Sequence, residues 1–408
     1  MNGFISGSFW HQHQSPYSDT KNTYHAEVLT CRQRKERRLP KAASRGLGRT
    51  PARHLGRAAR NSAGPFTRST TLYRRECFGL AMSGTVDATC SDTLTGRGAY
   101  RQEPRFTALE TNASILEVGT ARIFIDPHLV GPLVFFDPRF FAQYKTKLHI
   151  SDTRQVSEMR KRIREQFGPI SLVVLSQALA DHAHEPSLRY LDRELPVVAP
   201  NSARPLLTKL GFENVQYLRP GNSFRMDCGS ERSPSDEYVD IQAVKGSVVG
   251  PPWQEPENGY IFRLYRVLAP NEAHVCVFRM FYEPHGNFDA SALRTALAST
   301  QDPDGRLVDV VLTPPIRVLF AGVYELLRGA PSAVELVQLL RPQMVIPIRN
   351  WEGHQSGLLS GLLRGTGSLQ EFRESVAQIA RRLQLDTQLV RIGEPGEAFT
   401  LPLRPLSS

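Results

Sequence analysis

Apolar residues follow a regular pattern only after about residue 105. From Met1 to about Arg105 no hydrophobic period is sustained, and Arg, Ser, Thr, Gly and Ala dominate. From Phe106 onward, short apolar runs alternate with polar turns, which is typical of strands and helices joined by loops. We therefore expect a largely disordered leader of residues 1–105, followed by one domain of residues 106–408.

The apolar runs of this domain predict both strands and helices. Alternating or continuously apolar runs predict strands at residues 114–117, 121–126, 171–175, 197–199, 238–244, 260–267, 274–281, 308–312 and 344–348. Apolar residues at helical spacing predict helices near residues 153–166, 201–210, 317–328, 331–341 and 368–384. Two successive blocks of strands end in helices, which indicates a layered domain with helices outside packed sheets.

One short stretch, residues 171–188, concentrates the candidate chemistry. Its sequence is SLVVLSQALADHAHEPSL, in which an apolar run breaks off into a polar segment. A second polar turn of this kind, EPHG, follows the predicted strand 274–281. Buried strands that end in polar loops are a common way to place reactive groups. The candidate metal ligands in the two segments are Asp181, His182, His184, Glu283 and His285.

The positive charge of the chain belongs to its leader. The formal net charge is +10, but residues 1–75 hold 15 Lys or Arg and 3 Asp or Glu, whereas residues 76–408 hold 35 and 37. A nearly neutral domain argues against a nucleic-acid-binding function. No apolar run approaches the roughly 18–20 residues that span a bilayer, so we expect no membrane span. Cys228 and Cys276 lack CxxC spacing and indicate ordinary thiols.

The leader has the composition of a targeting segment. It is rich in arginine, contains serine and has few acidic residues, which is typical of an organelle transit peptide. We expect delivery to the plastid (chloroplast) stroma, with the mitochondrion as the alternative. A basic arm that contacts nucleic acid or membrane non-specifically is the other interpretation.

Several motifs, taken in order, resemble those of the metallo-β-lactamase-fold superfamily. They are ARIFIDP, the His/Asp-rich loop after residue 175, GPPW followed by ENGY, YEPHG, LTPP and VIPIRN. Together with the basic leader they are similar to plastid-type members in plants and algae. The resemblance covers about residues 109–403 and implies an α+β fold, a four-layer αββα sandwich with its active site along one edge.

The resemblance also implies a metal site, from which this sequence departs. The family motif S/T-H-x-H-x-D-H binds one or two zinc or iron ions. Asp181 and His182 match its end, but Gln177 and Leu179 stand at its two earlier histidines. Leucine cannot bind a metal, and glutamine does so poorly. Where a last histidine is expected, the chain reads Arg349-Asn350, and the fixed positive charge of arginine favours an anion over a metal.

The remaining candidates have two interpretations each. Asp181 and His182 are the candidate catalytic residues, with Asp181 a metal ligand or a general base. Alternatively, Asp181 and Glu185 cap or charge-match the start of the next helix, and the histidines are hydrogen-bonded loop residues. Asp126 either supports the site by accepting the ring N–H of a metal-binding histidine or only ends its strand.

The candidate substrate-binding residues are Arg349, Trp253 and Asn258. Arg349 binds an anion or is a surface or ion-paired arginine. The loop that ends at Trp253 is the wall of a small-molecule pocket, to which Asn258 supplies an amide, or only a structural turn.

Two functions from different classes fit these residues. The first is metal-assisted hydrolysis of an ester, thioester or lactone, with at most one zinc, iron or manganese ion bound by Asp181, His182, His184, Glu283 and His285. The second is a non-catalytic binding protein on the same fold that recognises an anionic metabolite or a partner. A nuclease is less favoured, because such enzymes usually need two metals.

Overall fold

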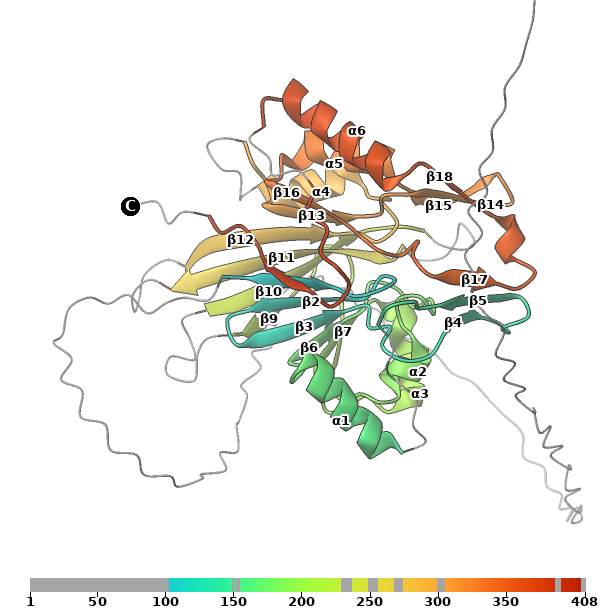
Figure 1. The fold of residues 1–408 in the computed structure, drawn as a ribbon. Coiled ribbons are helices and arrows are strands. Elements are labelled where there is room, and N and C mark those ends of the chain that lie inside the picture. Colours follow the sequence, from blue (N-terminus) through green and yellow to red (C-terminus); the bar gives the residue numbers. More distant parts are fainter. Residues whose placement is uncertain are drawn as a thin grey trace, which may run out of the picture. The chain divides into compact units, whose positions relative to one another are not determined.

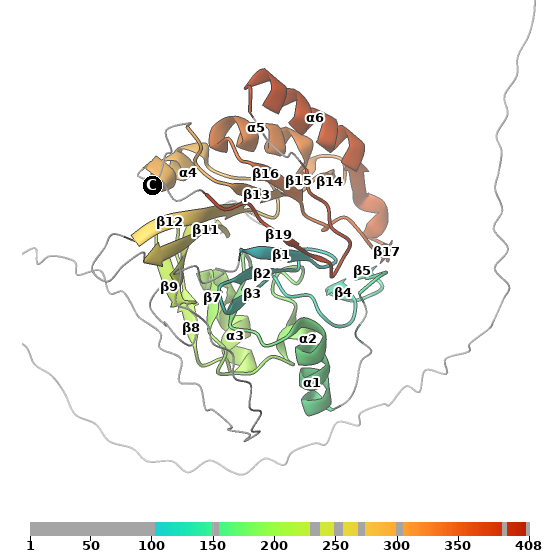
Figure 2. The ribbon, with the colours of Figure 1, turned by 60° about the vertical axis from the view of Figure 1, so that its left-hand side comes forward.

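The computed structural model describes residues 103–148, 150, 155–228, 237–248, 256–267, 274–298, 305–385 and 390–404. In this part of the chain two mixed β-sheets pack face to face, and helices cover their outer faces (Figures 1 and 2). This is the α+β arrangement, helix layer, two sheets, helix layer, that the sequence predicts. No helix among the described residues has the length and apolar character needed to cross a bilayer.

The first sheet has seven strands, of which the last four in spatial order are parallel. In spatial order they are β19 (Ala398–Thr400), β1 (Arg105–Ala108), β2 (Ser114–Val118), β3 (Ala121–Ile125), β6 (Leu172–Val174), β7 (Val197–Ala199) and β8 (Val215–Tyr217). Strands β3, β6, β7 and β8 run parallel, so their carboxyl ends share one edge. The outer face carries α1 (Val156–Phe167), α2 (Glu185–Leu188) and α3 (Arg204–Leu210), the last preceded by a 3₁₀ turn, Asn201–Ala203.

The second sheet has six strands. In spatial order they are β16 (Met344–Pro347), β13 (Val310–Thr313), β12 (His274–Tyr282), β11 (Asn258–Val267), β10 (Glu237–Lys245) and β9 (Ser223–Asp227). Strands β12, β13 and β16 are parallel, so their carboxyl ends also share an edge. The helices α4 (Ala290–Leu297) and α5 (Ala330–Leu340) pack on its outer face, and α6 (Leu369–Arg382) packs on α5.

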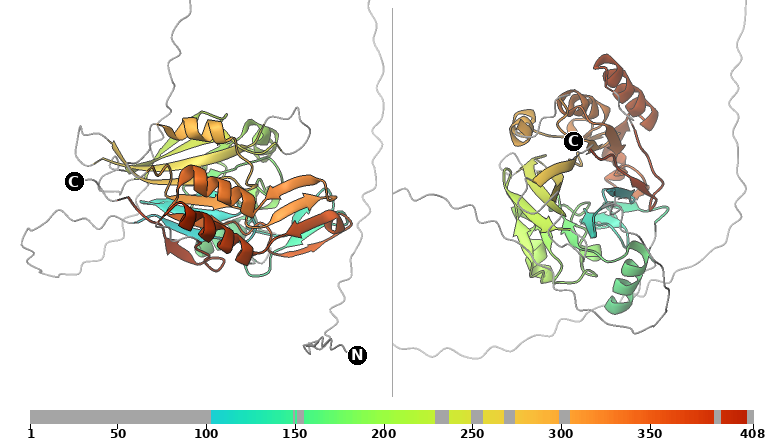
Figure 3. Two further views of the ribbon diagram at one scale, coloured as in Figure 1. Left: turned by 90° about the horizontal axis from the view of Figure 1, so that it is seen from above. Right: turned by 90° about the vertical axis from the view of Figure 1, so that its left-hand side faces the viewer.

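Two smaller sheets of three strands each complete the described part. One contains β15 (Tyr324–Arg328), β14 (Arg317–Phe320) and β18 (Leu363–Thr366), and the other contains β17 (His354–Ser356), β5 (Phe141–Tyr144) and β4 (Leu133–Phe135). A 3₁₀ turn, Ser360–Leu362, precedes β18. Figures 1 and 3 show both small sheets gathered at one end of the two large sheets.

The central strands are buried on both faces, which explains their nearly continuous apolar sequences. In β3, Ile123 and Ile125 point between the two sheets, and Phe124 points under the helices. This alternation follows from the two-residue period of a strand. From the opposite sheet, Ile241 and Phe262 complete the same inter-sheet core. Each of these five side chains is at most 1% exposed.

Strands occur at all nine predicted positions, and four of the five predicted helices are present. The helix predicted over residues 317–328 is wrong, since this segment forms the hairpin β14–β15. Ala321 and Gly322 both adopt positive φ angles there, as hairpin turns require. Pairing of β14 with β18 then decides the strand conformation. The predicted helix start at Thr153 lies outside the described residues.

The two large sheets are tied together at the edge where their parallel strands end. Tyr282 at the end of β12 donates its hydroxyl to Asp126 beyond β3, at 2.5 Å. The hydroxyl of Tyr260 donates to the Leu175 carbonyl at 2.9 Å, and the Asn258 N–H donates to the Ser176 carbonyl at 3.1 Å. Polar loops from both sheets therefore meet along a single edge.

Glu110 anchors a loop beside this edge, although the sequence pattern did not indicate it. Its carboxylate is 1% exposed and accepts the backbone N–H groups of Thr146, Lys147 and Leu148 at 2.6–3.0 Å. Burial alone would raise the pKa of Glu110, but these donors hold it below its usual value of 4.5. The ionised carboxylate thus fixes the chain that follows β5.

We expect Glu110→Gln to lower the free energy of unfolding by about 2–3 kcal/mol at pH 7, because a neutral amide accepts these donors more weakly. The folded-state pKa lies below 4.5, so the carboxylate contributes fully above that pH and progressively less below it. Urea unfolding of both proteins at pH 7 and about pH 4 should show the difference shrinking. The exposed Glu165→Gln is the control; an equal loss there would contradict the assignment.

Candidate functional site

Three residues predicted as metal ligands lie together at the shared edge of the sheets. One ligand atom from each of Asp181, His182 and His285 lies within 4.8 Å of the others. Asp181 Oδ2 is 3.1 Å from His182 Nε2, and the two histidine rings lie 5.1 Å apart at an angle of 63°. His182 is fully buried and His285 is 6% exposed. We call these three residues the His/Asp cluster.

The cluster is assembled from two loops that follow buried strands. Asp181 and His182 lie in the loop between β6 and α2, where a turn is closed by the His182 N–H donating to the Leu179 carbonyl at 3.0 Å. His285 lies in the turn after β12, which ends at Gly286 with a φ of +72°. A side chain at residue 286 would come within 2.8 Å of Ser332 Oγ, so this turn needs glycine.

Asp126 holds His182 in place from the end of β3. Its buried carboxylate accepts from His182 Nδ1 at 2.7 Å, from the Ser176 N–H at 2.7 Å, and from the hydroxyls of Ser176 and Tyr282 at 2.5 Å. Because Nδ1 of His182 is engaged in this way, Nε2 is the nitrogen that faces Asp181. The structure therefore contains the contact between Asp126 and a histidine N–H that the first interpretation of Asp126 requires.

Two residues at this edge have unusual backbone conformations. Asp126 has a φ of +46° and Thr111 a φ of +66°. Left-handed conformations are tolerated by aspartate but are uncommon for a β-branched residue. Thr111 precedes Asn112, whose amide lies 3.2 Å from His182 Nε2 and donates to the Asp181 carbonyl at 3.2 Å. The strained turn thus delivers an amide to the cluster.

Charge in the cluster is strongly coupled. Burial lowers the pKa of His182, but the facing carboxylates of Asp181 and Asp126 raise it to about 10. Burial likewise raises the pKa of Asp181, yet His182 brings it down to about 2. Burial lowers the pKa of His285 to about 3. One imidazolium between two carboxylates leaves a net negative charge, which favours a cation over an anion. A metal ion bound at His182 Nε2 would displace the proton of this imidazolium.

Buried oxygen atoms without hydrogen-bond donors surround the cluster. Besides Asp181 Oδ1, they belong to residues adjoining it, namely Asn112 Oδ1, Gln177 Oε1, Glu257 Oε1 and Asn350 Oδ1. Unsatisfied buried acceptors are costly, and a cation or bound water would relieve them. Together with two imidazoles, such oxygens suit zinc, iron or manganese. The residues present therefore fit one divalent cation.

His184 and Glu283, two other predicted ligands, lie outside the His/Asp cluster. His184 Nδ1 pairs with Ser187 Oγ at 2.8 Å and Nε2 with the Pro132 carbonyl at 3.1 Å, so both ring nitrogens already have partners. Its position at the start of α2 turns it away from the cluster. Glu283 instead supports His285: its carboxylate accepts the His285 N–H at 3.1 Å and the Ser247 hydroxyl at 2.8 Å.

The predicted substrate-binding residues have partners within the protein. Arg349 donates to Glu352 Oε2 at 2.5 Å and to the Gly393 carbonyl. It is thus an ion-paired arginine, as the second interpretation of this residue proposes. The Asn258 amide donates to the Leu218 carbonyl at 3.0 Å and lies 3.2 Å from the Tyr260 hydroxyl. Trp253 lies outside the described residues. Both described residues are thus engaged within the protein.

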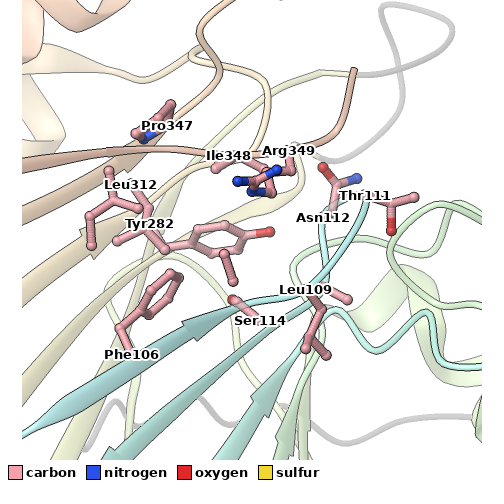
Figure 4. Close-up of a pocket in the computed structure, with 13 residues that line it drawn as sticks. Phe106, Leu109, Thr111, Asn112, Ser114, Tyr282, Leu312, Pro347, Ile348 and Arg349 are labelled. Carbon is pink, nitrogen blue, oxygen red and sulfur yellow. The ribbon is translucent and has the colours of Figure 1, made fainter. Parts of the chain in front are cut away.

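A small cavity lies between the sheets beside the cluster (Figure 4). It measures about 10 Å³, and Asn112, Tyr282 and Arg349 contribute to its lining. This volume is roughly that of one water-sized probe. The cavity therefore has room for a solvent molecule but not for a substrate.

Sequence reasoning missed several residues that adjoin the cluster. Asn112 and Ser176 are single polar residues next to strands and carry no recognisable pattern. Glu257 lies within the ENGY motif, directly before Asn258. Its carboxylate accepts the Ser202 hydroxyl at 2.9 Å, and burial raises its pKa to about 6. Its place in that motif was the signal that could have identified it.

Comparison with known proteins shows that this chain matches a family model. Residues 105–349, more than half of the chain, match the family described as beta-lactamase superfamily domain. None of the curated proteins matches this sequence.

Three of the similar solved structures come from two bacteria and an archaeon. A "possible metal-dependent hydrolase" from Veillonella parvula DSM 2008 is 15% identical, with a TM-score of 0.47, over 74% of this chain and 100% of that one. Igni18, a metallo hydrolase from Ignicoccus hospitalis KIN4/I, is 18% identical, with a TM-score of 0.44, over 74% and 99%. CmlA, a diiron beta-hydroxylase from Streptomyces venezuelae, is 14% identical, with a TM-score of 0.45, over 74% and 55%.

The family match begins at β1 and ends just beyond β16, so it contains both loops of the His/Asp cluster and most strands of the two large sheets. The chain belongs to the beta-lactamase superfamily.

Proposed function

We propose that the protein is a metal-dependent hydrolase with one metal centre, formed by Asp181, His182 and His285. The observation that carries this proposal is the convergence of their ligand atoms within 4.8 Å. The net negative charge there and the unpartnered oxygen Asp181 Oδ1 support a cation. The substrate class is an ester, thioester or lactone of a small molecule.

A divalent cation bound there would supply Lewis acidity towards a carbonyl oxygen and lower the pKa of water. The residues of the chain have separate tasks. Asp126 fixes the orientation of His182, Glu283 holds the turn that carries His285, and Asn112 contacts Asp181 and His182. The supporting hydrogen bonds thus come from residues outside the cluster, as metal sites generally require.

The replacement of two motif histidines by Gln177 and Leu179 favours one metal ion over two. Leu179 offers no ligand atom, and Gln177, whose Nε2 is engaged with His285 Nδ1 at 2.5 Å, offers only a neutral carbonyl oxygen, which is a poor ligand. The second candidate, a non-catalytic protein that binds an anionic metabolite, relied on Arg349. Because Arg349 is paired with Glu352, we place the hydrolase first.

We expect the full-length protein to contain about one zinc, iron or manganese ion per chain, since three ligands suffice for a catalytic site. Plasma mass spectrometry should show most of it lost from Asp181→Asn/His285→Asn. The variant His354→Asn removes an exposed histidine on β17 and is the control, with circular dichroism confirming folding. A wild type that stays free of metal after reconstitution would favour the binding protein. Metal retained in the double variant would refute the proposed ligands.

We further expect Asp126→Asn to weaken zinc binding by about 10- to 100-fold, because the residue that orients His182 loses its charge. Competition titration against a zinc chelator measures the dissociation constant. Asp192→Asn alters a half-buried acidic residue that pairs with Arg160 of α1, and it should leave the dissociation constant unchanged. Equal affinities for both variants would show that Asp126 does not act on the centre.

We also propose that the basic leader directs the protein to the plastid stroma, with the mitochondrion as the alternative. Its arginine-rich, acid-poor composition supports this. Residues 1–105 fused to a fluorescent protein should accumulate in plastids of plant cells. A leader with its arginines replaced by glutamine should leave the reporter in the cytosol, and an unchanged cytosolic signal for both would contradict the proposal.

A further inference from the structure

The side chain of Asn112 contacts two of the three residues in the His/Asp cluster. Its amide nitrogen lies 3.2 Å from His182 Nε2 and 3.4 Å from Asp181 Oδ2, and it donates to the Asp181 carbonyl at 3.2 Å. Asn112 is 3% exposed, and its other amide atom, Oδ1, has no hydrogen-bond donor. A buried amide with one end unpaired therefore adjoins the cluster.

The amide of Asn112 is poorly matched to the ring of His182. Carboxylate oxygens face both ring nitrogens, Asp126 Oδ2 at 2.7 Å and Asp181 Oδ2 at 3.1 Å, so both nitrogens carry protons and donate. The amide nitrogen of Asn112, which is also only a donor, lies 3.4 Å from Nδ1 and 3.2 Å from Nε2. The contact therefore brings donors together, while the acceptor Oδ1 is buried without a partner, which is costly.

A divalent cation would remove this mismatch. It would replace the proton on His182 Nε2, and half a turn of the amide about its last side-chain bond would exchange Nδ2 for Oδ1. The oxygens of Asn112 and Asp181 would repel each other without a cation, but both can face one. Asn112 also lines the cavity of about 10 Å³ (Figure 4), so packing does not enclose its side chain on every side.

The spacing of the atoms suits ligands of one metal ion. The Asn112 amide nitrogen, His182 Nε2 and Asp181 Oδ2 lie 3.1–3.4 Å from one another. Two ligand atoms at about 2.0–2.1 Å from one ion in tetrahedral geometry are roughly 3.3–3.4 Å apart. Rotation of the amide would place Oδ1 close to the position that the nitrogen now holds, and thus at a similar spacing.

The other buried side-chain oxygens without donors next to the cluster are less well placed. Gln177 contacts His285, through its nitrogen. Within the described part of the chain, neither Glu257 nor Asn350 forms a side-chain hydrogen bond to a residue of the cluster. Asn112 is therefore the one amide in this group that contacts two members of the cluster.

We propose that Asn112 is a fourth protein ligand of the cation, which it binds through Oδ1. This rests on the metal centre proposed above and adds to it a ligand from the loop between β1 and β2. A neutral amide oxygen is a weak ligand for zinc, whereas carbonyl oxygens suit manganese. A position for water remains when the ion is five- or six-coordinate, as zinc sometimes and manganese usually is.

Titration of the metal-free full-length protein with Co²⁺, followed by visible absorption, reports the affinity and the ligand set together. We expect Asn112→Leu to weaken Co²⁺ binding by about tenfold or more, at least as much as the loss of a supporting residue. Asn112→Asp should bind at least as tightly as wild type, because a carboxylate is a stronger ligand than an amide, and its absorption spectrum should be shifted.

Asn214→Leu and Asn214→Asp are the matched controls. The Asn214 amide also donates to a backbone carbonyl, that of Glu194 at 2.8 Å. It lies just before β8, at the edge of the sheet opposite the cluster. Both variants should keep the affinity and the spectrum of the wild type. Circular dichroism checks folding, and Asn112→Asp, which preserves the shape of the side chain, decides the matter if Asn112→Leu does not fold.

The variants distinguish a ligand from a residue that only holds Asp181. An ionised aspartate cannot donate to the Asp181 carbonyl, so weak binding by Asn112→Asp would assign Asn112 a supporting role and overturn the proposal. Tighter binding with an unchanged spectrum would show that the added charge acts without coordination, and would overturn it too. Wild-type affinity in a folded Asn112→Leu would have the same consequence. A wild type that binds no Co²⁺ would refute the metal centre itself, and this ligand with it.

Discussion

The carboxylate of Asp126 is the group on which the edge of the domain depends. It is fully buried and accepts hydrogen bonds from Ser176 and His182 of one sheet and Tyr282 of the other. A buried charge is tolerated only while its partners remain, so the two sheets cannot separate at this edge without leaving it uncompensated. The same contacts hold His182 in the cluster. The packing of the two sheets at this edge and the geometry of the site therefore depend on the same hydrogen bonds.

The large sheets could be predicted because each strand carries its own pattern. In β3 the alternation of inward and outward residues is visible in ARIFI without reference to any partner. The small sheets could not, since β14 and β15 have an apolar spacing that also suits a helix. Their conformation depends on β18, which follows more than thirty residues later. The local sequence of β14 and β15 does not indicate that β14 pairs with β18.

The candidate site was predictable where reactive residues are dense and uncertain where they are isolated. Asp181 and His182 are neighbours, and His285 follows a predicted strand, so position alone identified them. His184 belongs to the same dense segment, yet the start of α2 turns it towards Ser187. Asn112 comes from a different loop and became visible only when the fold brought it to His182.

Thr111 is, among the described residues, the only β-branched residue with a positive φ angle. Such a conformation costs on the order of 1–3 kcal/mol and persists only where its surroundings impose it. Here the surroundings are a bridge to Arg349 and a hydrogen bond to His128. A glycine would adopt the same turn without strain. The protein thus gives up stability at the position that carries the amide of Asn112, which indicates that the shape of this edge is maintained for a purpose other than the stability of the fold.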